Sequence, residues 1–467
     1  MLRLEVHGTA GTSALLSGLQ VAGRRPDPGV ATSSSGGPAP RLIILYVSDT
    51  TRSDRMSVFG YDRATTPRMQ QLVDAGADAW VAQSNSSWTR PSIATMLTGL
   101  EQGAHGVGTK WDSLAPDLPV LSEQLSDAGY RTVAFSGSSH VQEGSGFARG
   151  FDRFEDVSEP PTASDLKPRI EHYVEDILSE IDLSDGAPLF VFVHSIGPHD
   201  PYQPPMYAQT ALNLPTIPRV YGEELAGGVA QLKWVELAFR DRIPMDGAIV
   251  GGLSELYDAE IYAEDVQFGA FVDALEQRDL WKDTLMVFAA DHGEEFAEHG
   301  SLRHGRTLFD EQLEVPLVVH WPAGWAPKKS ESAGLLDIAP TIAAVAGADP
   351  IPRAQGRDLT TTPPTPRYWH AEVDAEKLYA LWDDRFKLIR RLGREGAVEL
   401  YDRDQDPEEL INLHTSHPAR LQLMSAALEA RHEENARLRR GHGKATAGLT
   451  ETQEARLRVL GYLDDPQ

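Results

Sequence analysis

The sequence predicts an α/β protein whose large central sheet is mostly parallel and flanked by helices. Three observations predict this fold class. First, five short apolar runs are typical of buried strands, and they span residues 42–47, 132–135, 189–193, 284–289 and 315–320. Second, helical patterns lie among these runs, at residues 67–75, 120–128, 170–181 and 254–277. Third, the strands and helices alternate at a spacing typical of βαβ units.

The length of the chain and one biased segment predict its domain organisation. A chain of 467 residues suits one large α/β domain with a smaller appended domain. Residues 24–40 are rich in Pro, Gly and Ser and can bury little apolar surface, which is typical of a linker. We therefore expect a flexible N-terminal segment over residues 1–40 and a folded domain that begins near Arg41.

The charge balance limits the partners that this chain can have. The formal net charge is -26, from 43 Lys and Arg against 69 Asp and Glu, which argues against a nucleic-acid partner. An anionic substrate would need a bound cation and a local basic cluster to draw it in. There is no cysteine, which excludes a thiolate nucleophile and cysteine metal ligands. No apolar run is long enough to span a bilayer.

Polar side chains follow three of the predicted strands. Asp49 follows the first, His194 and His199 follow the strand at 189–193, and Asp291 and His292 follow the strand at 284–289. Ligands of such sheets bind beyond the carboxyl ends of the strands, so we expect these residues at one edge. Carboxylate and imidazole together suit a divalent cation such as Mg²⁺, Mn²⁺ or Ca²⁺. Taken alone, Asp49 could equally be a helix cap.

Thr89 and two histidines are further candidates for the chemistry. Thr89 lies just ahead of a predicted helix that starts at Pro91, where the helix dipole favours an anion or an alkoxide. The alternative is that this threonine only caps the helix. His199 and His304 lie in loops, and either could hold a substrate oxygen or protonate a leaving group. Loop histidines are otherwise often plain hydrogen-bonding residues.

Several blocks of the sequence resemble the sulfatase family of the alkaline phosphatase superfamily. Residues 49–60 (DTTRSDRMSVFG) resemble its opening motif, and residues 89–99 (TRPSIATMLTG) resemble its nucleophile segment. Five more blocks follow in the family's order, at residues 190–205, 291–300, 304–319, 385–390 and 400–413. The resemblance implies an alkaline-phosphatase-like sandwich followed by a small C-terminal α+β subdomain. We accordingly expect a catalytic domain at 41–350 and a subdomain with a helical tail at 351–467.

The resemblance also implies roles for individual residues. Three of them match metal-ligand positions, and these are Asp49, Asp291 and His292. Thr89 matches the nucleophile, which also touches the metal. His199 matches a histidine that binds a substrate oxygen, and His304 stands where many relatives have lysine or histidine. One divalent ion, Ca²⁺, Mn²⁺, Mg²⁺ or Zn²⁺, is the expected cofactor.

Three positions depart from the pattern of true sulfatases. Those enzymes have Cys or Ser, oxidised to formylglycine, where this chain has Thr89, and an Arg four residues later where it has Ile93. Many also carry a second Asp where this chain has Thr50. Threonine cannot yield the formylglycine aldehyde, and relatives that use threonine act on phosphorus. Arg90 or Lys110 could supply the missing positive charge.

The resulting prediction is a metal-dependent hydrolase that cleaves a phosphate or sulfate ester through Thr89, with a phosphorus ester favoured. Two alternatives stay open: a phospho-group transferase of the phosphoglycerol or phosphoethanolamine type, and a catalytically silent sulfatase-like binding domain. The substrate would be a small-molecule, glycan-linked or lipid-linked anionic ester. Family habit alone favours an extracytoplasmic site, and the sequence does not indicate an oligomeric state.

Overall fold

A seven-stranded sheet forms the centre of the molecule. The structure is a computed structural model that describes residues 37–159, 167–215, 219–220, 223–224, 229–239, 243–327, 329–361, 367–373, 377–392, 398–440 and 445–446. Most of the predicted N-terminal segment, residues 1–36, lies outside the described residues. The strand order in the central sheet is β2-β12-β9-β1-β6-β4-β5. The bounds are β1 Leu42–Ser48, β2 Asp78–Gln83, β4 Arg131–Ser136, β5 Arg153–Asp156, β6 Leu189–Ser195, β9 Thr284–Ala289 and β12 Glu314–His320.

All five strands predicted from apolar runs are present, and the sheet is mostly parallel as expected. Strands β9, β1, β6, β4 and β5 pair in parallel, whereas β12 is antiparallel to both β9 and β2. The two strands that the sequence did not reveal, β2 and β5, lie at the edges. Edge strands are partly exposed and therefore lack the continuous apolar run of a buried strand.

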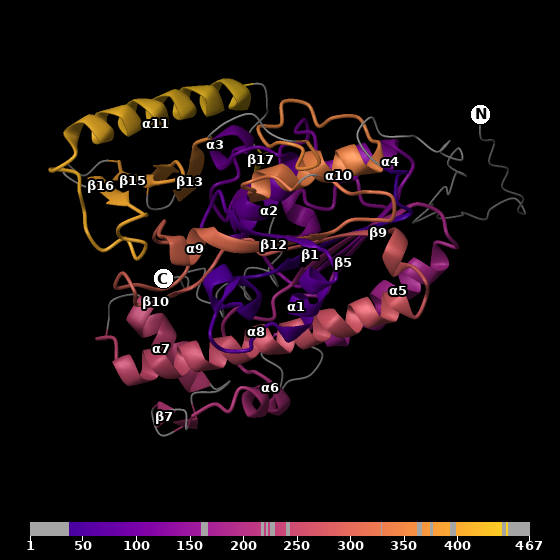
Figure 1. Cartoon of the computed structure of the whole chain (residues 1–467), viewed down its shortest axis with the longest axis horizontal. Coiled ribbons are helices and arrows are strands. Elements are labelled where there is room, and N and C mark those ends of the chain that lie inside the picture. The colour runs from indigo at the N-terminus through magenta and orange to yellow at the C-terminus, as the bar shows by residue number, and fades with distance from the viewer. Residues whose placement is uncertain are drawn as a thin grey trace, which may run out of the picture.

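Helices cover both faces of this sheet (Figure 1). Helices α2, α4 and α10 lie on one face, and α1, α5 and α8 lie on the other. Alternate residues of β1 point into the two cores, Leu45 into one and Ile44 into the other, which explains its unbroken apolar sequence. The bounds are α1 Pro67–Asp74, α2 Thr89–Thr98, α4 Leu121–Asp127, α5 Val174–Leu183, α8 Gly247–Glu276 and α10 Ile338–Ala346.

The long helix α8 contributes an unusual buried face. It begins at Gly247, earlier than predicted, because the Asp246 side chain caps it by accepting from the backbone N–H groups of Ala248 and Ile249. Its buried residues include acids and a tyrosine as well as apolar side chains, among them Tyr257 and Glu260. Tyr257 bonds the loop after β1, and Glu260 accepts from the backbone N–H of Gln203 in the loop after β6. The helix therefore braces two strand-end loops.

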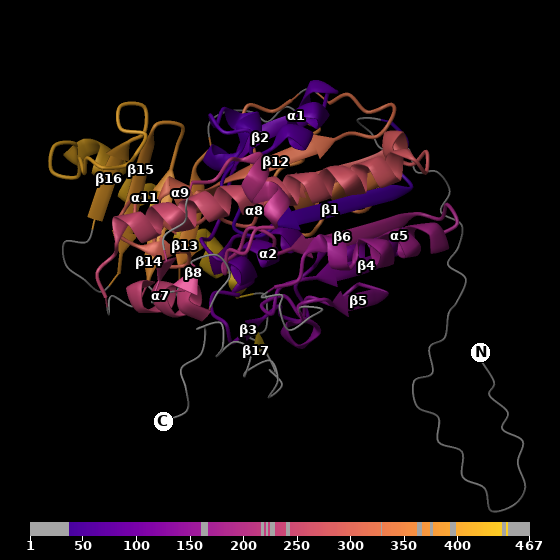
Figure 2. The ribbon, with the colours of Figure 1, turned by 90° about the horizontal axis from the view of Figure 1, so that it is seen from below.

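A four-stranded antiparallel sheet forms the C-terminal subdomain, at one end of the central sheet (Figure 2). Its strands are β13 Trp369–Val373, β14 Leu378–Trp382, β15 Phe386–Arg391 and β16 Val398–Asp402, and helix α11 Pro418–Arg439 packs on them. Trp369 and Trp382 share a core with Leu313 of the larger domain. This arrangement confirms the predicted fold class. We propose the division at residue 350 as a working domain boundary.

Further α-helices and strands lie in the described part of the chain. The helices are α3 Gln102–His105, α6 Met206–Ala211, α7 Val229–Phe239 and α9 Asp310–Leu313. The strands are β3 Asp112–Ser113, β7 Arg219–Val220, β8 Glu223–Glu224, β10 Glu295–Phe296, β11 Leu302–Arg303 and β17 Ala445–Thr446. Among the described residues, no helix combines the length and apolar character needed to cross a membrane.

Candidate active site

The parallel pairing of β1 with β9 brings two acidic loops together. Val47 pairs with Ala289, so the residues that follow the two strands emerge side by side. The backbone N–H of Thr50 donates to Asp291 Oδ1 at 3.1 Å. Thr50 has φ 60, a left-handed conformation that is costly for a β-branched residue. Tyr257 donates to the carbonyl of Thr50 at 2.6 Å and so helps to hold this strained turn.

Asp49, Asp291 and His292 converge as a group that fits a metal ion. Their ligand atoms all lie within 4.8 Å of one another. His292 Nδ1 lies 2.9 Å from the carbonyl of Gly293 and donates to it, which leaves a lone pair on Nε2. That Nε2 lies 3.4 Å from Asp291 Oδ2 and 3.6 Å from Asp49 Oδ1.

The hydrogen bonding of this group is consistent with a cation-binding site. Asp49 Oδ1 and Asp291 Oδ2 are buried and have no hydrogen-bond partner among the described residues. Buried carboxylate oxygens are normally paired, because leaving them unpaired is costly. Two carboxylates and one neutral imidazole are a donor set that divalent cations accept. The residues present therefore fit the metal that the sequence predicted.

Burial shifts the pKa values of all three residues. Burial and the charge of Asp49 raise the pKa of Asp291 to about 7, and burial lowers the pKa of His292 to about 4. Burial alone would raise the pKa of Asp49, but its interactions with His194 and with the charges of His199 and His292 bring it below its usual range. Negative charge is thus concentrated on Asp49, where a cation would offset it.

Thr89 is the first residue of α2, and not a residue ahead of the helix as the sequence suggested, because Trp88 takes the capping position. Its Oγ1 lies 3.3 Å from His292 Nε2, the nitrogen that faces the two carboxylates. The hydroxyl is buried and sits at the positive end of a ten-residue helix. The structure thus brings the hydroxyl of Thr89 next to the three candidate metal ligands, Asp49, Asp291 and His292.

His199 and His304 also lie at this group. The ring centroids of His304 and His292 are 4.4 Å apart, and those of His304 and His199 are 5.0 Å apart. His304 Nδ1 lies 3.0 Å from Glu294 Oε1. Burial, together with the charge of His199, lowers the pKa of His304 to about 3, so its ring is neutral in the free protein near pH 7.

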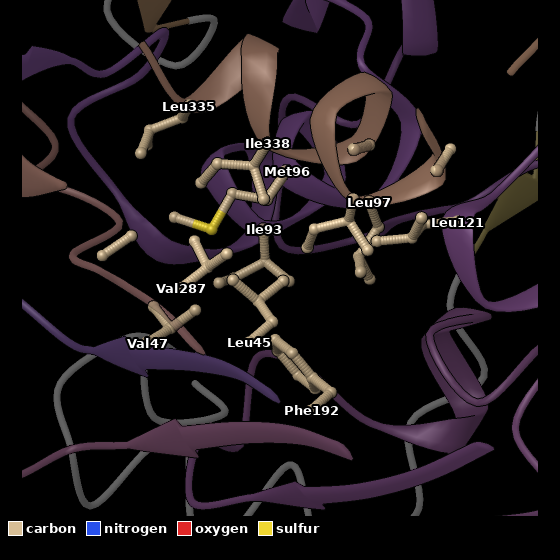
Figure 3. Close-up of a cluster of buried hydrophobic side chains, with 14 of the residues drawn as sticks. Leu45, Val47, Ile93, Met96, Leu97, Leu121, Phe192, Val287, Leu335 and Ile338 are labelled. Atoms are coloured by element: carbon tan, nitrogen blue, oxygen red, sulfur yellow. The ribbon is translucent and has the colours of Figure 1, made fainter. Parts of the chain in front are cut away.

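The structure shows what surrounds Ile93, which departs from the sulfatase pattern, and Arg90, which could supply the missing positive charge. Ile93 is fully buried among Leu45, Phe192 and their neighbours, where a charged side chain would have no partner (Figure 3). Arg90 is also buried, and its guanidinium donates to the carbonyls of His140 at 2.9 Å, Asp112 at 3.1 Å and Lys110. The cation adjacent to Thr89 is therefore engaged by backbone carbonyls.

Sequence reasoning assigned no role to several residues that border the site. His194 Nε2 lies 3.4 Å from Asp49 Oδ2, so this histidine lies at the sheet edge where the strand-end rule placed it, although no individual role was assigned to it. Glu294 contacts His304, and its position three residues after Asp291 is the only signal that could have identified it. Tyr202 and Tyr257 carry no such signal, because only the fold brings them here.

Comparison with known proteins gives a consistent family match. The profile described as Sulfatase matches residues 41–348, and the profile described as the C-terminal region of N-sulphoglucosamine sulphohydrolase matches residues 297–436. An N-acetylglucosamine-6-O-sulfatase of Bacteroides thetaiotaomicron is 22% identical over an alignment 461 residues long. That alignment covers 80% of this chain and 82% of that protein.

Solved structures agree with this match at the level of the fold. A protein crystallised in complex with its substrate D-glucosamine-2-N,6-O-disulfate aligns with a TM-score of 0.68 and 19% identity, covering 85% of this chain and 98% of its own. The phosphonate monoester hydrolase of Silicibacter pomeroyi aligns with a TM-score of 0.66 and 18% identity, covering 84% of this chain and 95% of its own. One fold thus serves both sulfate-ester and phosphonate-ester chemistry.

Proposed function

The chain belongs to the sulfatase family of hydrolases, and on that premise we propose that it is a metal-dependent enzyme that cleaves a phosphate or sulfate ester with Thr89 as the nucleophile. One observation carries the proposal. Thr89 Oγ1 lies 3.3 Å from His292 Nε2, and that same nitrogen faces two buried carboxylate oxygens that lack hydrogen-bond partners. A hydroxyl that only capped a helix would need no such group around it.

Asp49, Asp291 and His292, with the hydroxyl of Thr89, would hold one divalent cation, Ca²⁺, Mn²⁺, Mg²⁺ or Zn²⁺. When bound, such a cation lowers the pKa of the threonine hydroxyl and offsets negative charge in the transition state. The start of α2 adds the positive end of its dipole at the same oxygen. These features together favour the alkoxide form of Thr89.

The reaction then has two steps. In the first, Thr89 Oγ1 forms a bond to phosphorus or sulfur while the bond to the ester oxygen breaks, and the leaving alcohol takes a proton from His304 or His199. An anionic ester beside the rings favours their protonated form, which offsets the effect of burial on His304. In the second step water attacks phosphorus or sulfur while the bond to Thr89 Oγ1 breaks, and the histidine takes a proton from the water. Phosphate, phosphonate or sulfate is released and the side chain of Thr89 is restored.

Between the two ester classes we favour phosphorus. Threonine carries a methyl group on Cβ and cannot be oxidised to the aldehyde on which the sulfatase hydrate mechanism depends. The covalent intermediate is therefore an ordinary threonyl ester, which must be cleaved at phosphorus or sulfur by water. The fold-level likeness to a phosphonate monoester hydrolase is compatible with this choice.

The test is an activity panel on protein stripped of metal and reloaded with Mn²⁺, Mg²⁺, Ca²⁺ or Zn²⁺. Aryl phosphate monoesters, aryl phosphate diesters, aryl phosphonates and aryl sulfates are compared for the wild type, Thr89→Ser and Thr89→Ala. We expect turnover of phosphorus esters, partial activity of Thr89→Ser and a loss of several orders of magnitude in Thr89→Ala with the fold intact.

The other outcomes identify the alternatives. A rate that rises with an added acceptor alcohol, with the alcohol found in the product, would identify a transferase. Metal binding without turnover of any ester would identify a silent binding domain. Preferred turnover of the aryl sulfates would reverse the choice of phosphorus.

A further inference from the structure

His304 is held by a buried chain of hydrogen bonds that the reaction scheme does not use. Its Nδ1 lies 3.0 Å from Glu294 Oε1, and the other carboxylate oxygen, Oε2, accepts from the hydroxyl of Tyr202 at 3.0 Å. Glu294 is fully buried and Tyr202 is 3% exposed. The chain therefore runs from Tyr202 through Glu294 to the ring of His304 through buried side chains.

The backbone of Glu294 is fixed on both sides. Its N–H donates to the carbonyl of Glu311 at 3.1 Å, and its own carbonyl accepts from Arg52 Nη1 at 2.9 Å. With its backbone and both carboxylate oxygens engaged, this residue cannot follow a rotation of the imidazole. The orientation of the ring is therefore set by the protein and does not depend on the substrate.

We propose that Glu294, supported by Tyr202, is a positioning residue that makes His304 the proton donor to the leaving group. When Glu294 is ionised, its Oε1 accepts the proton on Nδ1, which leaves Nε2 as the nitrogen that can donate a proton to the leaving group. A carboxylate that accepts a hydrogen bond from Nδ1–H also stabilises the imidazolium form, which is the form that donates a proton from Nε2. The acid of a catalytic triad acts on its histidine in the same way. This inference rests on the proposed function.

The proposal separates the two histidines that the sequence treated alike. His199 Nδ1 lies 2.5 Å from the carbonyl of Asp200 and 3.4 Å from Asp200 Oδ1, so its main partner is a backbone carbonyl. Of these two histidines, His304 has the closer carboxylate at Nδ1, with Glu294 Oε1 at 3.0 Å, whereas Asp200 Oδ1 lies 3.4 Å from His199 Nδ1. We therefore assign proton donation to His304 and substrate binding to His199.

The neighbouring residue Glu295 provides a matched control. It is also fully buried, but its carboxylate bonds Thr307, Gln312 and the backbone N–H of Ser301, and it does not touch His304. Glu294→Gln and Glu295→Gln thus make the same chemical change one residue apart. A loss of activity that came only from a disturbed loop would appear in both variants.

The kinetic test uses a series of aryl esters whose leaving groups range from 4-nitrophenol to phenol. We expect Glu294→Gln to lose about tenfold or more in kcat on the phenyl ester and little on the 4-nitrophenyl ester, as His304→Ala does. The double variant should lose no more than His304→Ala alone. Tyr202→Phe should give a smaller change of the same form, and Glu295→Gln should leave the leaving-group dependence unchanged. Equal losses along the series, or additive losses in the double variant, would overturn the proposal.

A second measurement does not depend on turnover. Nitrogen-15 NMR of histidine-labelled protein, with the His304 signals assigned by their loss in His304→Ala, reports which ring nitrogen carries the proton. We expect a proton on Nδ1 in the wild type and in Glu295→Gln, and a changed protonation pattern in Glu294→Gln. An unprotonated Nδ1 in the wild type refutes the proposed positioning even if the enzyme is active. A protonated Nδ1 in a protein that hydrolyses no ester would instead contradict the proposed function and leave Glu294 with no proton donor to position.

Discussion

Two buried clusters of acidic side chains in this molecule differ in the side chains that pair with them. In the first, between the larger domain and the C-terminal subdomain, Lys387 Nζ lies 2.8 Å from Asp310 Oδ1 and 3.0 Å from Glu409 Oε1. In the second, Asp49 and Asp291 meet at the sheet edge with one buried oxygen on each that has no hydrogen-bond partner among the described residues. The first cluster contains a lysine ammonium, whereas only histidines lie within ion-pair distance of the second among the described residues.

The difference teaches how to distinguish a structural cluster from a functional one. A buried acid that is paired with a lysine needs nothing further, and its removal mainly destabilises the fold. Two acids that face each other without a cation oppose each other's ionisation, and here Asp49 raises the pKa of Asp291, which costs folding free energy. Their presence makes physical sense if a cation binds between them, and each prediction below tests this contrast.

The largest effect is expected from Asp291→Asn, which removes one of the two open carboxylates. Metal binding should be lost, and activity should fall by about a thousandfold or more, because the cation contributes several kcal/mol to the transition state. The metal-free variant should be at least as stable as the metal-free wild type, since a buried carboxylate with one unpaired oxygen has been replaced by a neutral amide. Elemental analysis and thermal melts with and without metal measure this. A variant that keeps both its metal and its activity would refute the ligand assignment.

The second largest effect is expected from Lys387→Met, which breaks the first cluster. Leaving Asp310 and Glu409 without their ammonium should reduce the free energy of unfolding by about 3–5 kcal/mol. Metal affinity should not change. Urea unfolding and calorimetric metal titration measure the two properties. The control is Arg390→Gln at an exposed ion pair with Glu429, which should change stability little. A loss of metal affinity in Lys387→Met would show that the two clusters are not independent.

The third prediction concerns pH and metal affinity. The metal-free Asp291 has its pKa raised to about 7, whereas His292 has its pKa lowered to about 4. Metal binding requires the ionised carboxylate, so the cation competes with one proton below pH 7. The apparent affinity should be flat above pH 7 and fall by up to about tenfold per pH unit below it. Isothermal titration in buffers of different ionisation enthalpy measures both the affinity and the released proton. An affinity that is flat from pH 5 to pH 8 would contradict the coupling.

The smallest effect is expected from Tyr257→Phe. Its hydroxyl holds the carbonyl of Thr50, whose N–H in turn donates to Asp291 Oδ1. The same hydroxyl also accepts from the backbone N–H of Arg52, and losing these two bonds to the turn should weaken metal binding about fivefold, corresponding to about 1 kcal/mol. Tyr46→Phe is the matched control, because Tyr46 is equally buried but donates to Glu264 instead. If both variants bind metal as the wild type does, the turn at Thr50 does not depend on these bonds.

The sequence revealed much of the fold because the central strands are apolar on both faces. The run at residues 42–47 has this property because Leu45 and Ile44 enter two separate cores. The edge strands β2 and β5 were missed because they are only partly buried and their apolar residues are few and bounded by polar ones. Helix α8 was found but placed too short, because its first turns from Gly247 precede the clear apolar pattern.

The candidate site could be predicted as a set of residues but not as an arrangement. The strand-end rule and the resemblance together named Asp49, Asp291 and His292, and the structure brings their side chains within one small volume. Glu294 and Tyr257 could not be assigned from sequence, because their roles depend on contacts between segments far apart in the chain. The position of Glu294 three residues after Asp291 is a weak signal, and Tyr257 has no spacing signal at all.

The account depends on a covalent step at Thr89, and rapid quenching tests that step most directly. Metal-loaded enzyme is mixed with its best ester, quenched in acid during turnover and digested, and the peptide that contains Thr89 is examined by mass spectrometry. The account predicts a phosphoryl, phosphonyl or sulfuryl group on Thr89 that disappears when the substrate is exhausted and never forms in Thr89→Ala. Active, turning-over enzyme whose Thr89 peptide stays unmodified at the earliest quench times, together with near-native turnover in folded and metal-loaded Thr89→Ala, would show that water attacks the ester directly.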